Sequence, residues 1–284
     1  MNNKGKKKSR FQIVWKRLKK NKMAMVGLYI IIIMLIVSAI APYIAPYDYS
    51  EMGQEILAGP SSEHLLGTDE FGRDVLSRLL YGARYSFEFG IVAVFVGAAV
   101  GLLMGSIAGF FGGWVDNIIM RFLDIYQSVP MMVMAIALSS SLGAGMRSAV
   151  IAIGISTLPI YARLIRGSLL EIRGMEYIEA AVSVNASKSR ILLRHMIPNA
   201  ISPVIVTLTM SVGLNVLAGA SLSFIGLGAQ QPLPEWGAML SAGRDYMRDY
   251  QRLVILPGAL IMILVLSFNM CGDGLRDALD PRQN

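Results

Sequence analysis

The feature that most constrains this chain is a series of long apolar segments separated by polar ones. A membrane-spanning helix needs about 20 mainly apolar residues, because the hydrocarbon core of a bilayer is about 30 Å thick. Six segments of the 284-residue chain qualify or nearly qualify, at 23–44, 89–111, 122–142, 148–164, 201–222 and 253–271. The sequence therefore predicts an all-α integral membrane protein with six transmembrane helices.

The charges of the chain are few and unevenly placed. Only 16% of the residues are charged, whereas a typical soluble domain has about 25%. The net charge is +7, and ten of the 26 Lys and Arg residues lie within 1–22, directly before the first apolar segment. A basic segment in that position is attracted to anionic lipid headgroups. The charge therefore indicates a membrane surface, and we do not expect a nucleic-acid partner.

The distribution of Lys and Arg also predicts the orientation, because cytoplasmic segments of membrane proteins are enriched in these residues. If the N-terminus is cytoplasmic, 19 of the 26 Lys and Arg residues lie on the cytoplasmic side. We therefore expect both termini to be cytoplasmic. The expected organisation is a basic cytosolic tail (1–22), a first transmembrane helix with an external loop (23–83) and a transmembrane domain (84–284).

The apolar segments contain almost no ionisable groups. The stretches 129–142, 148–160, 201–222 and 253–270 have no Asp, Glu, Lys, Arg or His. A transporter coupled to protons or sodium usually keeps such groups near the membrane midplane, so their absence argues against secondary transport. No GxxxxGK[ST] phosphate loop occurs, so energy from ATP would come from another chain. His64 and His195 stand apart from Cys and acidic clusters, and we expect neither a metal site nor a catalytic site.

Small residues recur at four-residue spacing in the second apolar segment. This spacing places glycines on one helix face, where another helix can approach closely. The partner is either a helix of this chain or a second membrane subunit. The residues concerned are Gly101, Gly105, Gly109 and, by extension, Gly113.

Three residues inside the apolar segments affect helix geometry and packing. Pro130 and Pro159 are expected to kink their helices, because proline removes a backbone hydrogen bond. Asn215 is polar in an apolar environment. We expect Asn215 to make an interhelical hydrogen bond rather than a substrate contact.

The connection between the fourth and fifth apolar segments has a helical pattern. Tyr177, Ile178, Ala181 and Val184 fall at helical spacing and predict one apolar face. We expect Pro198 to limit the helix that follows. Two interpretations are open on this pattern alone: a helix that rests on the membrane surface, or a docking element for a cytosolic partner.

The segment Glu179-Ala180-Ala181, followed at a distance by Pro198, resembles the EAA motif of permease subunits in binding-protein-dependent ABC importers. In that family the motif forms a coupling helix that fits a groove on the ATPase subunit. The resemblance therefore implies a cytosolic coupling helix near 175–186. The family has a glycine where this chain has Asn185, and asparagine is the next most tolerant residue for a left-handed backbone. The family pattern ends in Ile-x-Leu-Pro, and residues 195–198 of this chain depart from that ending at two positions.

Further motifs resemble the C-type permease of dipeptide, oligopeptide and nickel importers. The segments 66–69 and 72–78 look like its outer-loop signature, 221–228 with 234–237 like its fifth-span signature, and 272–281 like its C-terminus. The resemblance implies the type I ABC importer permease architecture in a bacterial or archaeal cell (inner) membrane. It implies three kinds of partner besides the bilayer: a second homologous permease in a heterodimer, two ATPase subunits that bind ATP and Mg²⁺, and an extracytoplasmic solute-binding protein. No cofactor is expected on this chain.

The expected cargo is a dipeptide or oligopeptide. The alternatives of the same class are glutathione and nickel or another metal chelate, and the alternative of a different class is a secondary transporter or channel. The expected coupling residues are Glu179, Ala180, Ala181, Asn185 and Pro198.

Three residues of the expected external loops are candidates for docking of the binding protein, namely Arg73, Asp74 and Trp236. Each has a competing interpretation. Arg73 and Asp74 also fit a role in which they pair with neighbouring residues and shape the loop. Trp236 also fits an aromatic anchor at the membrane interface.

Overall fold

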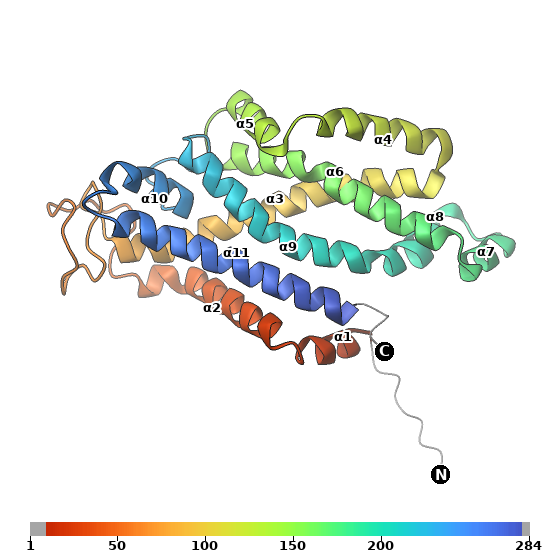
Figure 1. Ribbon diagram of the computed structural model, residues 1–284, viewed down its shortest axis with the longest axis horizontal. Coiled ribbons are helices and arrows are strands. Elements are labelled where there is room, and N and C mark those ends of the chain that lie inside the picture. The colour runs from red at the N-terminus through yellow and green to blue at the C-terminus, as the bar shows by residue number, and fades with distance from the viewer. Residues whose placement is uncertain (1–9, 280–284) are drawn as a thin grey trace, which may run out of the picture.

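The computed structural model describes residues 10–279 and shows helices joined by loops (Figure 1). In chain order the helices are α1 (Arg10–Leu18), α2 (Lys22–Ile44), α3 (Val75–Phe111), α4 (Gly113–Gln127), α5 (Met131–Leu142), α6 (Met146–Arg173), α7 (Glu176–Ser183), α8 (Lys188–Arg190), a π-helical turn (Ile191–Met196), α9 (Ile197–Phe224), α10 (Trp236–Gly243), a 3-10 turn (Arg244–Tyr246) and α11 (Arg252–Leu279). Among the described residues, α2, α3, α6, α11 and the continuous helix Lys188–Phe224 are long and apolar enough to cross a membrane. The prediction of an all-α membrane protein is confirmed.

The third predicted span is a broken one. Helices α4 and α5 meet at an angle of 84° and make a sixth crossing only if they are counted together. The break falls at Pro130, which disfavours helical geometry at the residue before it. Two ion pairs tie α4 to α6, because Asp116 accepts hydrogen bonds from Arg166 at 2.5 and 2.6 Å and Asp124 accepts one from Arg163 at 2.8 Å. Pro159, by contrast, lies within α6 without interrupting it.

The glycine face of α3 packs against α6 of the same chain. A Cβ atom at Gly101 would lie 2.6 Å from the carbonyl oxygen of Leu158, and one at Gly105 would collide with the carbonyl oxygen of Ala162. The two helices can approach this closely only because these positions lack side chains. The interpretation of this face as packing within the chain is therefore confirmed for Gly101, Gly105 and Gly109. Gly113 lies outside the contact, in open space at the start of α4.

Two expected boundaries differ from the ends of the helices. The division between residues 83 and 84 falls inside α3, which begins 14 residues before the apolar segment, so the predicted loop and the predicted transmembrane domain share one continuous helix. Pro198 does not limit the helix, since the chain stays helical from Lys188 to Phe224. The π-helical turn before Pro198 accounts for this continuity, because its wider hydrogen bonds, such as Ile197 N–H to Leu192 O, accommodate a residue that cannot donate.

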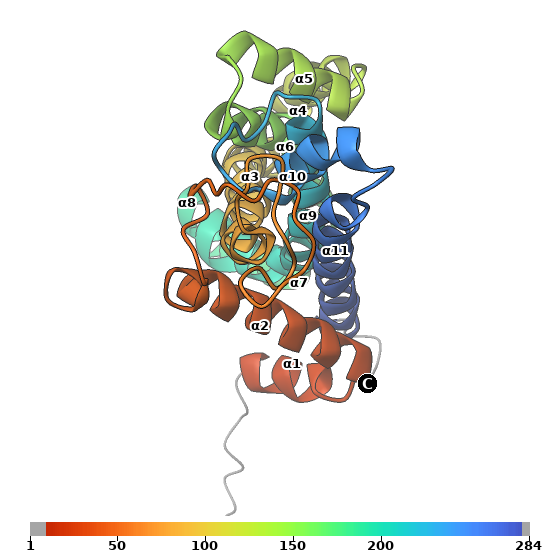
Figure 2. The same ribbon diagram turned by 90° about the vertical axis from the view of Figure 1, so that its left-hand side faces the viewer.

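The predicted basic tail contains a short helix. Helix α1 lies beneath the start of α2 (Figure 2), and its last residue Leu18 packs with Ala24 of α2 and Ala278 of α11. Asn21 then caps α2 by accepting a hydrogen bond from the Ala24 N–H at 3.1 Å. The rest of the predicted tail, residues 1–9, and the C-terminal residues 280–284 lie outside the described residues.

The functional candidates lie at opposite ends of the long axis. The loop between α2 and α3 and helix α10 form one end, and α7 protrudes from the other (Figure 1). Helix α1 and the last turns of α11 lie toward the α7 end. The chain thus brings its two terminal helices and α7 to one side of the bundle.

A pair of glycine substitutions tests the α3–α6 contact. We expect Gly105→Ala to destabilise the protein by about 1–3 kcal/mol, the usual cost of overpacking, because the new methyl group meets Ala162 and Ile165. Gly167→Ala on α6 is the matched control, because its Cβ would find open space and alanine favours a helix by about 1 kcal/mol. Thermal unfolding in detergent measures both. Equal melting temperatures for the two variants would contradict the packing described.

Candidate functional site

Helix α7 is held to the end of the bundle by one apolar contact. Ile178 is 4% exposed and packs with Leu169 and Ile172 of α6 and with Met196 of the π-helical turn. Only Ile178 and Ala181 of the predicted apolar face turn inward. Helix α7 is therefore attached where α6 ends and the π-helical turn before α9 begins, while most of its surface is exposed.

The end of α7 is a Schellman motif, in which a left-handed residue after a helix lets two N–H groups bond back to its last carbonyls. The N–H of Ala186 donates to Ala181 O at 3.1 Å, and that of Asn185 donates to Val182 O at 2.9 Å. Asn185 has a φ of 54°, as its tolerance of left-handed geometry predicted. Asn185 thus makes the reversal that returns the chain to Lys188–Phe224.

The remaining side chains of α7 face outward. Glu179 and Ala180 are exposed, and three apolar side chains lie beside them. Tyr177, Val182 and Val184 are 39%, 59% and 77% exposed. Tyr177 and Val184 were expected on the same apolar face as Ile178, and that expectation is wrong. Pro198 is also exposed, at the start of α9, with the π-helical turn between it and α7.

At the opposite end, Arg73 is the centre of a buried ion-pair network. It is 1% exposed, its Nε donates to Asp69 at 2.7 Å and its Nη1 to Gln231 at 2.6 Å. Asp69 also pairs with Arg78 of α3 at 3.3 Å. These bonds join the loop, α3 and the segment before α10. This arrangement matches the loop-shaping interpretation of Arg73, and no sequence pattern pointed to Gln231.

Asp74 begins α3 as its N-cap. Its Oδ2 accepts hydrogen bonds from the Ser77 N–H at 2.8 Å and the Ser77 hydroxyl at 2.7 Å. Its Oδ1 lies 2.9 Å from His64 Nδ1. A carboxylate at this position satisfies N–H groups that have no partner within the helix. Because Asp74 is 2% exposed, it can influence a docking protein only through the shape of the loop.

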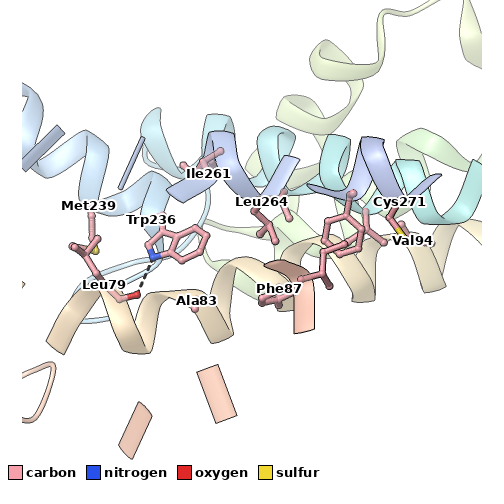
Figure 3. Packing of buried hydrophobic residues seen from close by; sticks show 14 of the residues in the cluster. Leu79, Ala83, Phe87, Val94, Trp236, Met239, Ile261, Leu264 and Cys271 are labelled. Carbon is pink, nitrogen blue, oxygen red and sulfur yellow. Dashed lines mark hydrogen bonds between the residues drawn. The ribbon is translucent and has the colours of Figure 1, made fainter. Parts of the chain in front are cut away.

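Trp236 is buried, which corrects its interpretation as an interfacial anchor. Its ring is 1% exposed and packs among Leu79, Met239 and Ile261 (Figure 3). Its Nε1 donates to Leu79 O at 3.1 Å, and Gly82 leaves the space for the ring. The tryptophan therefore fastens α10 to α3, and a docking role again requires an indirect effect.

Glu235 is a site residue that sequence reasoning missed. It is fully buried and caps α10 by accepting hydrogen bonds from Gly237 N–H and Ala238 N–H, both at 2.9 Å. Burial raises the pKa of its carboxyl above the ordinary value of 4.5, and the hydrogen bonds only partly oppose this. Glutamate is not among the preferred N-cap residues, so no local pattern signals the role.

Taken together, apolar spanning helices with a short helix protruding at one end define a multi-pass membrane protein. Residues 101–284 match the family model described as binding-protein-dependent transport system inner membrane component. Residues 9–60 match the N-terminal transmembrane domain of oligopeptide transport permease C. The chain belongs to the family of binding-protein-dependent transport system inner membrane components.

Relatives of known function cover nearly the whole chain. The dipeptide transport system permease protein DppC of Alkalihalophilus pseudofirmus is 44% identical over 269 residues, which are 94% of this chain and 88% of that protein. The glutathione transport system permease protein GsiD of Escherichia coli is 43% identical over 270 residues, covering 94% and 89%. The family itself implies ATPase and binding-protein partners.

Solved structures agree on the fold. The inward-facing MetNI methionine ABC transporter aligns with a TM-score of 0.59 at 21% identity and covers 72% of this chain and 97% of its own. An amino acid ABC transporter solved with histidines aligns with a TM-score of 0.53 at 17% identity, covering 70% and 92%. The type I permease architecture is thus confirmed.

The buried Glu235 makes the stability of this end depend on pH. A carboxyl whose pKa is raised on folding contributes fully below its unfolded value, and that contribution is lost as the pH rises through the folded value. We expect the melting temperature of the wild type to fall relative to that of Glu235→Gln as the pH rises from 5 to 8. Differential scanning fluorimetry at several pH values measures the difference. A difference that stays constant with pH would contradict the assignment.

Proposed function

We propose that this chain forms half of the translocation pore of an ATP-driven importer for dipeptides or oligopeptides, which an extracytoplasmic binding protein delivers. A homologous permease supplies the other half in a heterodimer. Two ATPase subunits bind and hydrolyse ATP with Mg²⁺, so this chain carries transport and not catalysis. The complex lies in a bacterial or archaeal cell (inner) membrane, with both termini and α7 on the cytoplasmic side.

The observation that carries the proposal is the exposure of α7. A helix that ends a membrane bundle usually turns its apolar side chains inward, yet Tyr177, Val182 and Val184 face out around Glu179. Apolar side chains next to a carboxylate suit a protein groove better than a bare membrane surface, where an acidic residue meets anionic headgroups. This favours the docking interpretation of the segment over the surface-helix interpretation.

The apolar attachment of α7 supports its role in transmitting force. Ile178 packs on both α6 and the start of the helix Lys188–Phe224, so a displacement of α7 reaches two membrane-spanning helices at once. The ATPase would then bind the inward- and outward-facing states with different free energies, and that difference drives the switch between them.

The break between α4 and α5 supports a path for polar solutes. A cavity of about 200 Å³ lies there, lined by Tyr126, Gln127 and Ser156 together with apolar residues. These are uncharged polar side chains, and backbone at a helix break is tolerated at membrane depth where it lines a cavity. A peptide bond offers matching donors and acceptors.

The relatives favour short peptides as cargo. One transports dipeptides and another glutathione, which is itself a tripeptide. Glutathione is therefore the main alternative, and a nickel chelate would use the same architecture. The binding protein selects among them.

Reversing one charge on α7 tests the proposal. We expect Glu179→Lys to abolish peptide uptake and to lower ATPase activity stimulated by the binding protein at least about tenfold, because a misplaced charge at an interface costs several kcal/mol. Membrane insertion should be unchanged. ATP hydrolysis of the purified complex in nanodiscs and uptake of a labelled dipeptide are the measurements.

The matched control is Glu171→Lys, which makes the same charge change at an exposed position on α6, before α7. We expect this variant to keep stimulated ATPase activity and uptake. Normal stimulation in the Glu179 variant would show that α7 does not dock the ATPase.

A further inference from the structure

Helices α4 and α6 are joined by two ion pairs of different character. The first, between Asp116 and Arg166, has two hydrogen bonds, and the Asp116 side chain is 12% exposed. The second, between Arg163 and Asp124, has one hydrogen bond of 2.8 Å, and its side chains are 42% and 57% exposed. An exposed ion pair with a single hydrogen bond contributes little to stability. The contact between the two helices therefore depends mainly on the first pair, and the second pair needs another explanation.

The exposed pair lies beside the cavity at the break between α4 and α5. Ser156 and Ile160 line this cavity from α6, and Arg163 follows Ile160 by three residues. Residues that are three, four and seven positions apart share one face of a helix, so Arg163 continues the cavity face of α6. Asp124 stands three residues before Gln127, which lines the cavity from α4. The pair thus stands at one edge of the cavity.

This edge of the cavity is the one nearer to α7. Helix α6 runs from Met146 to Arg173 and leads into α7, so Arg163 lies on the α7 side of Ile160. In the orientation of the proposed function, that is the cytoplasmic side. A solute that leaves the cavity for the cytoplasm therefore passes the two charges. Ionisable groups in a membrane bundle commonly line such a path, because they are costly where they face lipid.

The two charges match the two ends of a free peptide. At neutral pH a dipeptide has an ammonium group at one end and a carboxylate at the other. An Arg guanidinium donates to the carboxylate, and an Asp carboxylate accepts from the ammonium group. The two ends of an extended dipeptide lie at most about 7 Å apart, so neighbouring charges of opposite sign can contact both. Beside the charges, Tyr126, Gln127 and Ser156 present hydroxyl and amide groups to the peptide bond.

We propose that Asp124 and Arg163 form an exit site for zwitterionic peptides. Asp124 binds the α-ammonium group, Arg163 binds the α-carboxylate, and the cavity of about 200 Å³ holds the peptide backbone. This inference rests on the proposed function and names the charge pattern of its cargo. The ion pair opens when the peptide arrives, because each partner exchanges one charged hydrogen bond for another. The exchange costs little, since an exposed pair is weak.

The exit site distinguishes between the cargoes considered above. Glutathione fits it as a dipeptide does, because it carries an ammonium group and carboxylates. A free nickel ion does not fit it, since Arg163 would repel the ion and would find no group to bind. The site therefore favours short peptides with free ends.

The site is tested by removing one charge from the protein and the matching charge from the peptide. The complete importer and its binding protein are reconstituted in liposomes, and initial uptake of labelled dialanine, dialanine amide and N-acetyl-dialanine is measured. The binding protein contributes the same preference in every variant. A change of preference between variants therefore comes from the permease.

We expect Arg163→Gln to lower uptake of dialanine about tenfold, the fold-change for one lost hydrogen bond between charged groups, and to leave uptake of the amide unchanged. Asp124→Asn should lower uptake of dialanine by a similar factor and leave uptake of the N-acetyl form unchanged. The matched control is Arg244→Gln, which breaks another exposed ion pair, with Asp245. It should leave every preference unchanged.

A second measurement does not require the blocked peptides to be delivered. A free dipeptide that carries a diazirine in one side chain is photolysed during turnover, and the labelled residues are identified by mass spectrometry. We expect adducts at Met131 and Met134, which line the cavity. These adducts should fall about tenfold in Arg163→Gln and stay unchanged in Arg244→Gln.

The outcomes separate this proposal from the proposed function. Equal losses for all three peptides, an unchanged preference in both variants, or adducts only outside the cavity would overturn the exit site. Each of these results leaves the proposed function standing as long as the wild type takes up dialanine. A wild type that takes up no peptide would overturn both. Stimulated ATPase activity that survives Glu179→Lys would overturn docking at α7 alone.

Discussion

The contact between α3 and α6 is the interaction on which the rest of the structure depends. In a bilayer, lipid tails are as apolar as the helix surfaces, so the hydrophobic effect does not drive helices together and close packing must. Glycines at four-residue spacing on α3 supply that packing against the backbone of α6. Because α6 is fixed along this face, its far end is fixed as well, and with it the position of α7. In the proposed function, force on α7 would therefore reach the bundle through a contact that small residues make.

The two ends of the bundle use polar groups differently. At the loop end, Arg73, Asp74 and Glu235 are buried and hydrogen-bonded, so buried polar groups hold loops and short helices in one shape. At the α7 end, Glu179 and its apolar neighbours are exposed. A permease needs a stable external surface for its binding protein and an exposed element that its ATPase can contact. This division of polar groups fits both needs.

Much of this fold could be predicted from the sequence, because the length of the apolar segments and the spacing of the glycines are local features that determine the helices and their packing faces. The left-handed turn at Asn185 was predictable for the same reason. The burial of Trp236 was not, since it depends on Gly82 and Leu79, more than 150 residues away in sequence. The helix breaks at Pro130 but continues through Pro198, so proline alone does not predict a break. Tertiary packing decides between the two outcomes, and the local sequence does not reveal that packing.

The central claim is that α7 contacts an ATPase subunit, and site-directed cross-linking tests it most directly. The native Cys271 is buried, so a cysteine placed at Val184 would be the accessible one among the described residues. With a photoreactive thiol reagent in native membranes, we expect Val184→Cys to form an adduct with the ATPase subunit. The same substitution at exposed Met247, which directly follows the 3-10 turn after α10, should form none. An ATPase adduct from position 247, with none from position 184, would contradict the account.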